Sequence, residues 1–173
     1  LHALAAARRS VRSFAETDIP DEMIEKIISV ARCSPYASGR KNWDIAVIRD
    51  RAVIATAADL VAAAAIDLAG TVRDDFRADF LSYAESFAAF RSAPVILVPN
   101  FRISPAVSMM LNPPDESLLT WERDNATKSI SCVAMLILLA AESLGLAACY
   151  NTGSLIAAPE LTALLSIRNG REI

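Results

Sequence analysis

A cluster of basic and hydroxyl side chains near the start of the sequence is its most chemically suggestive feature. Residues 8–14 read Arg-Arg-Ser-Val-Arg-Ser-Phe, which places three guanidinium groups within five residues, together with two serines. A guanidinium offers a planar fork of donors that matches phosphate or carboxylate oxygens, and a serine adds a short hydroxyl donor. The pattern predicts an anion-binding site. A solvated helix end is the alternative interpretation of this segment.

The rest of the sequence offers little acid–base or metal chemistry. Its only histidine is His2, which excludes most Ser/His/Asp, Cys/His and multi-histidine arrangements. The three cysteines, Cys33, Cys132 and Cys149, are odd in number and lack repeated CxxC spacing. We therefore predict no catalytic side chain and no metal site, so that any catalysis depends on a bound cofactor. Reduced thiols and the lack of a visible signal peptide favour the cytoplasm.

Bulk composition predicts a single domain, residues 1–173, that hides apolar surface in an oligomer. Of its 173 residues 54% are hydrophobic, and the mean hydropathy is +0.35, above that of an average soluble domain. The net charge of −3 and the pI near 5.2 disfavour broad nucleic-acid binding. A regulator that reads nucleic acid through residues 8–12 is thus an alternative that the charge opposes.

The long apolar stretch near residue 135 is expected to position the segment that follows it in the chain. We predict a helix over 124–144, ended by Gly145, and a strand over 146–150. Residues 133–141 contain no polar side chain, and a helix that is apolar all round is normally buried. Nine apolar residues fall short of the roughly 20 that cross a bilayer. A core or subunit-interface helix is the favoured interpretation, with an interfacial membrane segment as the alternative.

Helical and strand patterns alternate along the remaining chain. Proline and acidic residues at 20–22 predict the start of a helix that ends near Cys33. Further helices are predicted over 51–68, 72–91 and 158–166, and strands over 43–48 and 94–98. An aromatic stripe in the 72–91 helix predicts packing rather than base stacking. Residues 99–123 show no period, which favours a lid or an excursion over a partner. At least three strands with helices packed on a small sheet indicate an α/β or α+β class.

Four segments, taken in this order, resemble the nitroreductase family of flavin mononucleotide (FMN) oxidoreductases. They are the basic cluster at 8–14, the 19–43 region with Ile-Pro-Asp-Glu, Ser-Pro-Tyr-Ala-Ser and Trp43, the Ala-Pro-Val-Ile-Leu-Val run at 93–98, and residues 129–150. The resemblance spans nearly the whole chain except 51–75 and 99–123. It implies an α+β fold with a small mixed sheet flanked by helices, a long apolar central helix and an intertwined homodimer.

The resemblance also implies the cofactor-binding residues. Arg8, Arg9 and Ser10 would bind the FMN phosphate, and Arg12 would reach the pyrimidine edge of the ring. Asn151, Thr152 and Gly153 would lie along the isoalloxazine near N5. The loop formed by Pro35, Tyr36, Ala37 and Ser38 would contact the flavin that is bound mainly by the partner subunit.

Two departures from the family pattern affect this expectation. The family usually carries Asn and then Gln-Pro before the tryptophan, whereas this chain reads Gly39-Arg40-Lys41-Asn42-Trp43. We expect the hydrogen bonds of those amides to be changed. The chain also ends at Ile173, before the family's last strand and the basic residues that complete its phosphate site, so either that segment is missing from the sequence or cofactor binding is weaker.

The function implied by the resemblance is an FMN-dependent oxidoreductase. It would transfer hydride from NADH or NADPH to an electron-poor acceptor such as a nitroaromatic or a quinone, and it would bind neither nucleic acid nor membrane. The alternative is a flavin-binding or cofactor-free dimeric interaction module without reductase activity.

Overall fold

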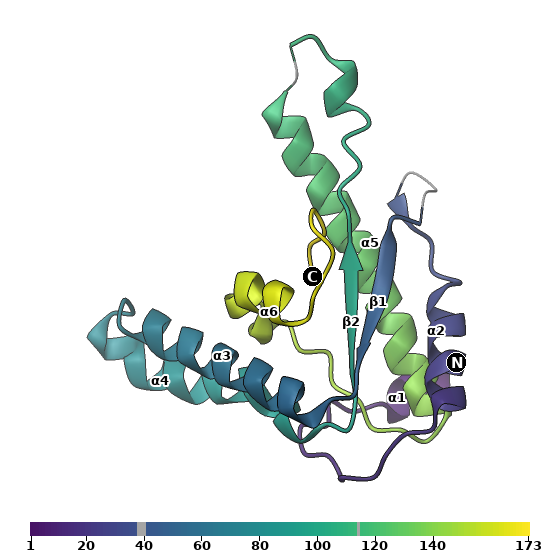
Figure 1. Cartoon of the computed structure of the whole chain (residues 1–173), viewed down its shortest axis with the longest axis vertical. Coiled ribbons are helices and arrows are strands. Elements are labelled where there is room, and N and C mark those ends of the chain that lie inside the picture. Colours follow the sequence, from purple (N-terminus) through teal and green to yellow (C-terminus); the bar gives the residue numbers. More distant parts are fainter. Residues whose placement is uncertain (38–40, 114) are drawn as a thin grey trace.

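The longest helix, α5 (Glu116–Ser143), packs against a two-stranded sheet (Figure 1). The computed structural model describes residues 1–37, 41–113 and 115–173. The strands β1 (Trp43–Ile48) and β2 (Ile96–Phe101) are antiparallel, with Trp43 opposite Phe101 and Ile48 opposite Ile96. The helix α2 (Asp21–Ala31) lies beside α5.

One hydrophobic cluster joins α2, α5 and β2. The spacing of Ile24, Ile27 and Ala31 places these three side chains on one face of α2, and all three are buried. They pack in one cluster with residues of α5 that include Val133, and with Phe101 of β2. This cluster fixes α2 along α5 and thereby fixes the loops at the ends of both helices.

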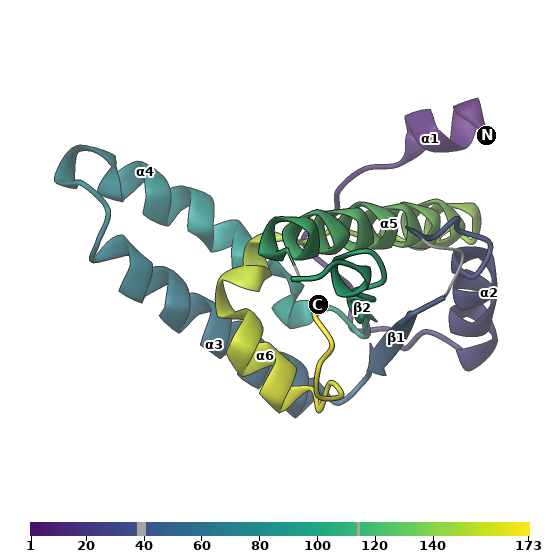
Figure 2. The ribbon, with the colours of Figure 1, turned by 90° about the horizontal axis from the view of Figure 1, so that it is seen from above.

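A second hydrophobic cluster joins the elements on the other side of the sheet. The helices α3 (Arg51–Ala69) and α4 (Asp74–Ala84) extend as an arm (Figures 1 and 2). The 3₁₀ segment η2 (Glu85–Ser92) follows α4, and η4 (Gly153–Ala157) leads into α6 (Ala158–Leu164). The cluster consists of Ala57, Val61, Ala65, Ala84, Phe87, Ala157 and Leu161. It brings η2 against η4, which carries the candidate residue Gly153.

Capping residues set the start of α3 and the end of α5. The Asp50 carboxylate accepts hydrogen bonds from the amides of Ala52 (2.8 Å) and Val53 (3.2 Å) and so begins α3. At the end of α5, Gly145 has φ of +73°, and the Leu146 amide donates to the Ala141 carbonyl at 2.9 Å. This is a Schellman motif, in which glycine supplies the left-handed residue that turns the chain away.

The structure corrects the prediction for residues 99–123. The helix α5 begins at Glu116 rather than Asp124, and β2 continues to Phe101. Asp115 caps α5 by accepting from the Ser117 amide at 2.8 Å. The charged side chains of the first two turns hide the apolar period, but the Pro-Pro-Asp sequence at 113–115 is an ordinary helix-start signal. Between these elements lies only a short excursion, with one 3₁₀ turn, η3 (Ser108–Met110).

The prediction of a strand over 146–150 is wrong. Within the described residues this segment forms a single parallel bridge, between Ser10 and Ala148, and the sheet has two strands instead of three. The chain before α2 runs alongside residues 146–150 only briefly, so no ladder develops. The predicted 72–91 helix is also divided, since α4 ends at Ala84 and η2 continues it. Its aromatic stripe is only partly packed, because Phe87 is buried whereas Phe76 and Tyr83 are exposed.

The apolar middle of α5 is not covered on every side by its own chain. Val133, Ile137 and Ala141 are buried, but Met135 is 49% exposed. Both α3 and α5 reach the length and mean hydropathy of a membrane span. A core helix of a globular protein also has these properties, and about half or more of the buried residues of each helix lie in the two clusters described above.

The excursion after β2 is held to α5 by Glu122. This largely buried carboxylate accepts hydrogen bonds from the Val107 amide at 2.6 Å and from the Ser108 hydroxyl at 2.5 Å. The Ser108 hydroxyl and the Val107 amide lower the pKa of Glu122, and desolvation opposes them only in part.

A group with a lowered folded-state pKa stabilises the protein above its unfolded-state pKa, and this contribution is lost as the pH falls through the folded-state pKa. We therefore expect Glu122→Gln to lower the Tm at pH 7, with the difference from the unmutated protein shrinking as the pH falls below about 4.5. Thermal unfolding at a series of pH values measures this. Glu25→Gln, at an exposed position of α2, is the matched control and should change little. A difference that stays constant with pH would contradict this role of Glu122.

Candidate functional site

The basic cluster and the segment that leads to Asn151 lie side by side. The Val11 amide donates to the Ala148 carbonyl at 3.2 Å, next to the bridge between Ser10 and Ala148. The Phe14 amide donates to the Ser92 hydroxyl at 3.4 Å, which ties the end of the cluster to η2. The structure thus brings together two segments about 140 positions apart in the sequence, as the sequence analysis expects.

The three arginines of the cluster have different environments. The Arg9 Nη1 donates to the carbonyls of Ala6 (2.6 Å), Ala7 (3.2 Å) and Arg8 (2.9 Å), where the short helix α1 (His2–Ala7) ends. Such a contact satisfies carbonyls that the helix leaves free. Arg8 approaches the Ser10 hydroxyl at 3.5 Å, and Arg12 is exposed. Among the residues that the structure describes, none of the three pairs with a carboxylate, so their positive charge is available to an anion.

The side chain of Asn151 holds its own loop in place. Its amide nitrogen donates to the carbonyls of Phe87 (2.9 Å) and Ser86 (3.3 Å), and its oxygen accepts from the Ser154 amide (3.2 Å). Because these contacts occupy the side chain, the groups of this loop that remain for a ligand are its backbone and Thr152, which is exposed.

Glycine is needed at position 153 because the backbone there packs against an aromatic ring. A Cβ atom at this position would lie 2.2 Å from Cδ1 of Phe87 and 2.6 Å from Cε1, far inside van der Waals contact. The Phe87 ring is buried in the second cluster and also meets Tyr83 edge to face, with the ring centroids 5.0 Å apart. The absence of a side chain therefore allows η2 and η4 to approach closely.

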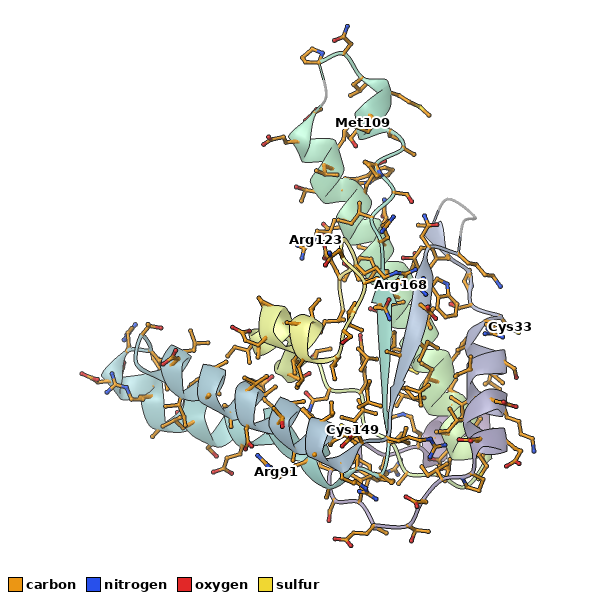
Figure 3. The ribbon with its side chains drawn as sticks, viewed as in Figure 1. Cys33, Arg91, Met109, Arg123, Cys149 and Arg168 are labelled. Carbon is orange, nitrogen blue, oxygen red and sulfur yellow. The ribbon has the colours of Figure 1, made fainter. Side chains whose placement is uncertain are left out.

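The loop at 34–37 lies at the opposite end of the sheet. The Ala37 amide donates to the Ser129 hydroxyl at 3.0 Å, and Ser129 is 14 residues before the end of α5. At about 1.5 Å per residue, this loop is roughly 20 Å along α5 from the basic cluster. Figure 3 labels Cys33, directly before this loop, and Cys149, directly after the residue that bridges to Ser10. One chain therefore does not bring Pro35, Tyr36 and Ala37 to the basic cluster. Ser38 and Gly39 lie outside the described residues.

A cavity of about 220 Å³, which we call the Tyr36 cavity, opens beside this loop. It is lined by Tyr36, Ala37, Asn42, Arg102, Ser104, Ala106, Val107, Trp121, Glu122, Asn125 and Ala126. One wall is fixed by two contacts: the Asn42 amide nitrogen donates to the Ser104 hydroxyl, and the Arg102 amide donates to the Asn42 carbonyl at 2.9 Å. Asn42, which departs from the family pattern, thus has a role within this chain.

The Tyr36 hydroxyl is buried without a hydrogen-bond partner among the described residues. Such a group costs about 1–3 kcal/mol when it is left unpaired, so its position in a cavity lining points to a ligand or an ordered water. Burial raises the pKa of Tyr36, and the Arg171 guanidinium opposes this only in part. Tyr36 is therefore a neutral hydrogen-bond donor at physiological pH. Arg102 and Trp121 were not predicted as site residues because they fall in the segment 99–123, which shows no period. Asn125 falls in the predicted 124–144 helix, where no sequence signal marks it as a site residue.

Comparison with known proteins agrees with this architecture. The sequence profile of the Nitroreductase family matches residues 5–173. This chain belongs to the Nitroreductase family. The family resemblance and the α+β fold predicted from the sequence are therefore confirmed, with a sheet smaller than predicted.

Two solved structures share the fold. A BluB-like flavoprotein from Clostridium difficile 630 superposes with a TM-score of 0.83 at 25% identity, covering 98% of this chain and 81% of that one. A nitroreductase with bound FMN from Desulfitobacterium hafniense DCB-2 gives a TM-score of 0.74 at 20% identity, covering 98% and 82%. These likenesses extend over nearly the whole of this chain rather than over one motif.

Curated relatives match over shorter segments. A protein of Methanothermobacter thermautotrophicus, named for NADH dehydrogenase or NAD(P)H nitroreductase activity, is 36% identical over 47 residues. The matched segment is 27% of this chain and 25% of that relative. The iodotyrosine deiodinase of Hydra vulgaris is 38% identical over 55 residues, which are 32% of this chain and 20% of the deiodinase.

The contact between Gly153 and Phe87 gives a direct test of how this part of the site is built. We expect Gly153→Ala to destabilise the protein by about 1–3 kcal/mol, because the added methyl group overpacks against a buried ring. Adding Phe87→Leu should remove part of the penalty, so that the double variant is more stable than the sum of the two single effects. Denaturant unfolding measures both quantities.

Gly70→Ala is the matched control for this substitution. A Cβ atom at Gly70 would meet only the Asp67 carbonyl oxygen, at 3.2 Å, and should cost less. Strictly additive effects of Gly153→Ala and Phe87→Leu would show that the two residues are not coupled.

Proposed function

We propose that this protein is an FMN-dependent oxidoreductase that transfers hydride from NADH or NADPH to an electron-poor acceptor such as a nitroaromatic or a quinone. The observation that carries the proposal is the uncompensated positive charge of Arg8 and Arg12 in a cluster that lies beside Ala148, on the segment leading to the 151–153 loop, in a chain of the Nitroreductase family. The FMN reported with the D. hafniense nitroreductase supports the choice of cofactor.

The residues of the basic cluster fit the two ends of an FMN molecule. Arg8 and Ser10 already approach each other at 3.5 Å and supply a charged and a hydroxyl donor for a phosphate, with Arg9 next to them at the end of α1. Arg12 places a positive charge near the pyrimidine edge of the ring. Bound FMN would supply the redox chemistry by accepting hydride from NAD(P)H and passing electrons to the acceptor.

The remaining residues shape the site rather than transfer protons. Asn151 fixes the 151–153 loop to η2, so that its backbone is presented in one conformation. A cation held near the pyrimidine edge stabilises the negative charge of the reduced ring and raises its reduction potential. No acidic or basic side chain is assigned a catalytic role.

We further propose that the protein acts as a homodimer with each flavin site built from two chains. The loop of Pro35, Tyr36, Ala37 and Ser38 would then contact the flavin held by the basic cluster of the other chain. The separation of roughly 20 Å along α5 between these two parts supports this arrangement, because one chain does not bring them together. The half-exposed Met135 in the apolar stretch of α5 supports a second chain packing there.

FMN binding tests the cofactor assignment. Purified protein should bind FMN with a flavin absorption spectrum and should bleach when NADH or NADPH is added. Arg8→Ala should weaken FMN binding by about 1.5–3 kcal/mol, because a charge-assisted hydrogen bond is lost. Arg168→Ala, at an exposed position of the carboxyl-terminal turn, is the control and should bind FMN normally. Protein that gains no flavin spectrum would exclude the proposal, and bound FMN that neither nucleotide reduces would favour an interaction module without reductase activity.

The charge of Arg12 tests the orientation of the ring. Arg12→Ala should lower the reduction potential of bound FMN and slow its reduction, while the oligomeric state stays unchanged. Arg12→Lys should retain most of the potential because it keeps the charge. Spectroelectrochemical titration measures the potential, and size-exclusion chromatography measures the assembly. A potential that does not change in Arg12→Ala would show that Arg12 does not face the ring.

A further inference from the structure

The Tyr36 cavity contains donor groups that the protein does not use itself. The Tyr36 hydroxyl has no partner among the described residues. The Arg102 guanidinium has five N–H donors, and the hydrogen bond it makes within the described part of the chain is from Nη2 to the Asn169 carbonyl at 3.2 Å. Arg102, which is exposed, therefore brings charged donors to the cavity lining that are available to an acceptor group.

The rest of the lining suits a flat apolar group. Ala37, Ala106, Val107 and Ala126 contribute small apolar side chains, and Trp121, which is 51% exposed, contributes an indole. An aromatic ring packs well against an indole face or edge. An apolar cavity of about 150 Å³ accommodates benzene in another protein, so about 220 Å³ has room for one ring with a substituent.

The charges near the cavity favour an anion over a cation. Arg102 lines it, and Arg171 lies close enough to Tyr36 to act on the phenol. Glu122 also belongs to the lining, but its two oxygens already accept hydrogen bonds from Val107 and Ser108. A carboxylate on the ligand would meet the planar donors of Arg102, with which it pairs in a bidentate geometry.

We propose that the Tyr36 cavity binds a monocyclic aromatic carboxylate, with Arg102 at the carboxylate and Trp121 against the ring. Aromatic acids that carry an electron-poor group would then be the preferred acceptors of the enzyme. This second statement rests on the proposed function, because Tyr36 and Ala37 belong to the loop that would lie beside the flavin of the other chain.

The experiment compares two ligands of nearly equal size that differ in charge, 4-nitrobenzoate and 4-nitrobenzamide. Equilibrium dialysis against the purified FMN-bound protein gives both dissociation constants. We expect 4-nitrobenzoate to bind about tenfold more tightly, and we expect Arg102→Gln to remove most of this preference. Arg168→Gln is the control, since it removes an exposed arginine of the same region that does not line the cavity.

The outcomes separate this inference from the proposed function. Equal binding of the two ligands, or a preference that persists in a folded Arg102→Gln protein, would overturn the cavity assignment even if NAD(P)H still reduces the flavin. A preference for 4-nitrobenzoate in protein that binds no flavin would keep the cavity assignment and overturn the proposed function. The comparison of the two ligands on the unmutated protein is decisive even if Arg102→Gln fails to fold, which circular dichroism would show.

Discussion

The packing of α2 on α5 is the contact on which the rest of the molecule depends. Ile24, Ile27 and Ala31 meet the apolar side of α5 around Val133, and β2 joins them through Phe101. Burying each of the larger side chains contributes about 1.5–3 kcal/mol to the stability of the fold. The contact also has a geometric effect, because α5 is long enough to hold one loop near its middle and another at its end.

Much of the fold follows from local sequence patterns, and the exceptions have physical reasons. The strand at 43–48, the α2 stripe and the α3 helix agree with their predicted positions. The beginning of α5 was not predicted because its first turns mix polar residues with the exposed Leu119 and Trp121, which leaves no regular apolar period. The capping signal at Asp115 marks the helix start where the hydrophobic period does not. Residues 146–150 are apolar enough for a strand, but a strand also needs a neighbour over several residues, and tertiary structure supplies only Ser10 and Val11.

Part of the candidate site could also be predicted from local sequence patterns. Clustered arginines predict an anion site without any knowledge of the fold, and the structure places their segment beside Ala148, which leads to the 151–153 loop. The hydrogen bonds that Arg9 and Asn151 make within the chain could not be predicted from the sequence, because both side chains donate to carbonyl groups whose positions are set by the fold. The Tyr36 cavity could not be predicted from the sequence at all. Its lining comes from four separate segments, and no short motif describes a space between segments.

The position of the two loops on one rigid helix has a genetic consequence under the proposed assembly. A chain altered in its basic cluster still carries an intact loop at 35–37, because α5 keeps the two regions roughly 20 Å apart. A chain altered in that loop still carries an intact basic cluster. When two such chains associate, one of their two shared sites contains both alterations and the other contains neither. Two inactive versions of this protein would therefore complement each other within a single mixed pair, with half of the normal number of working sites.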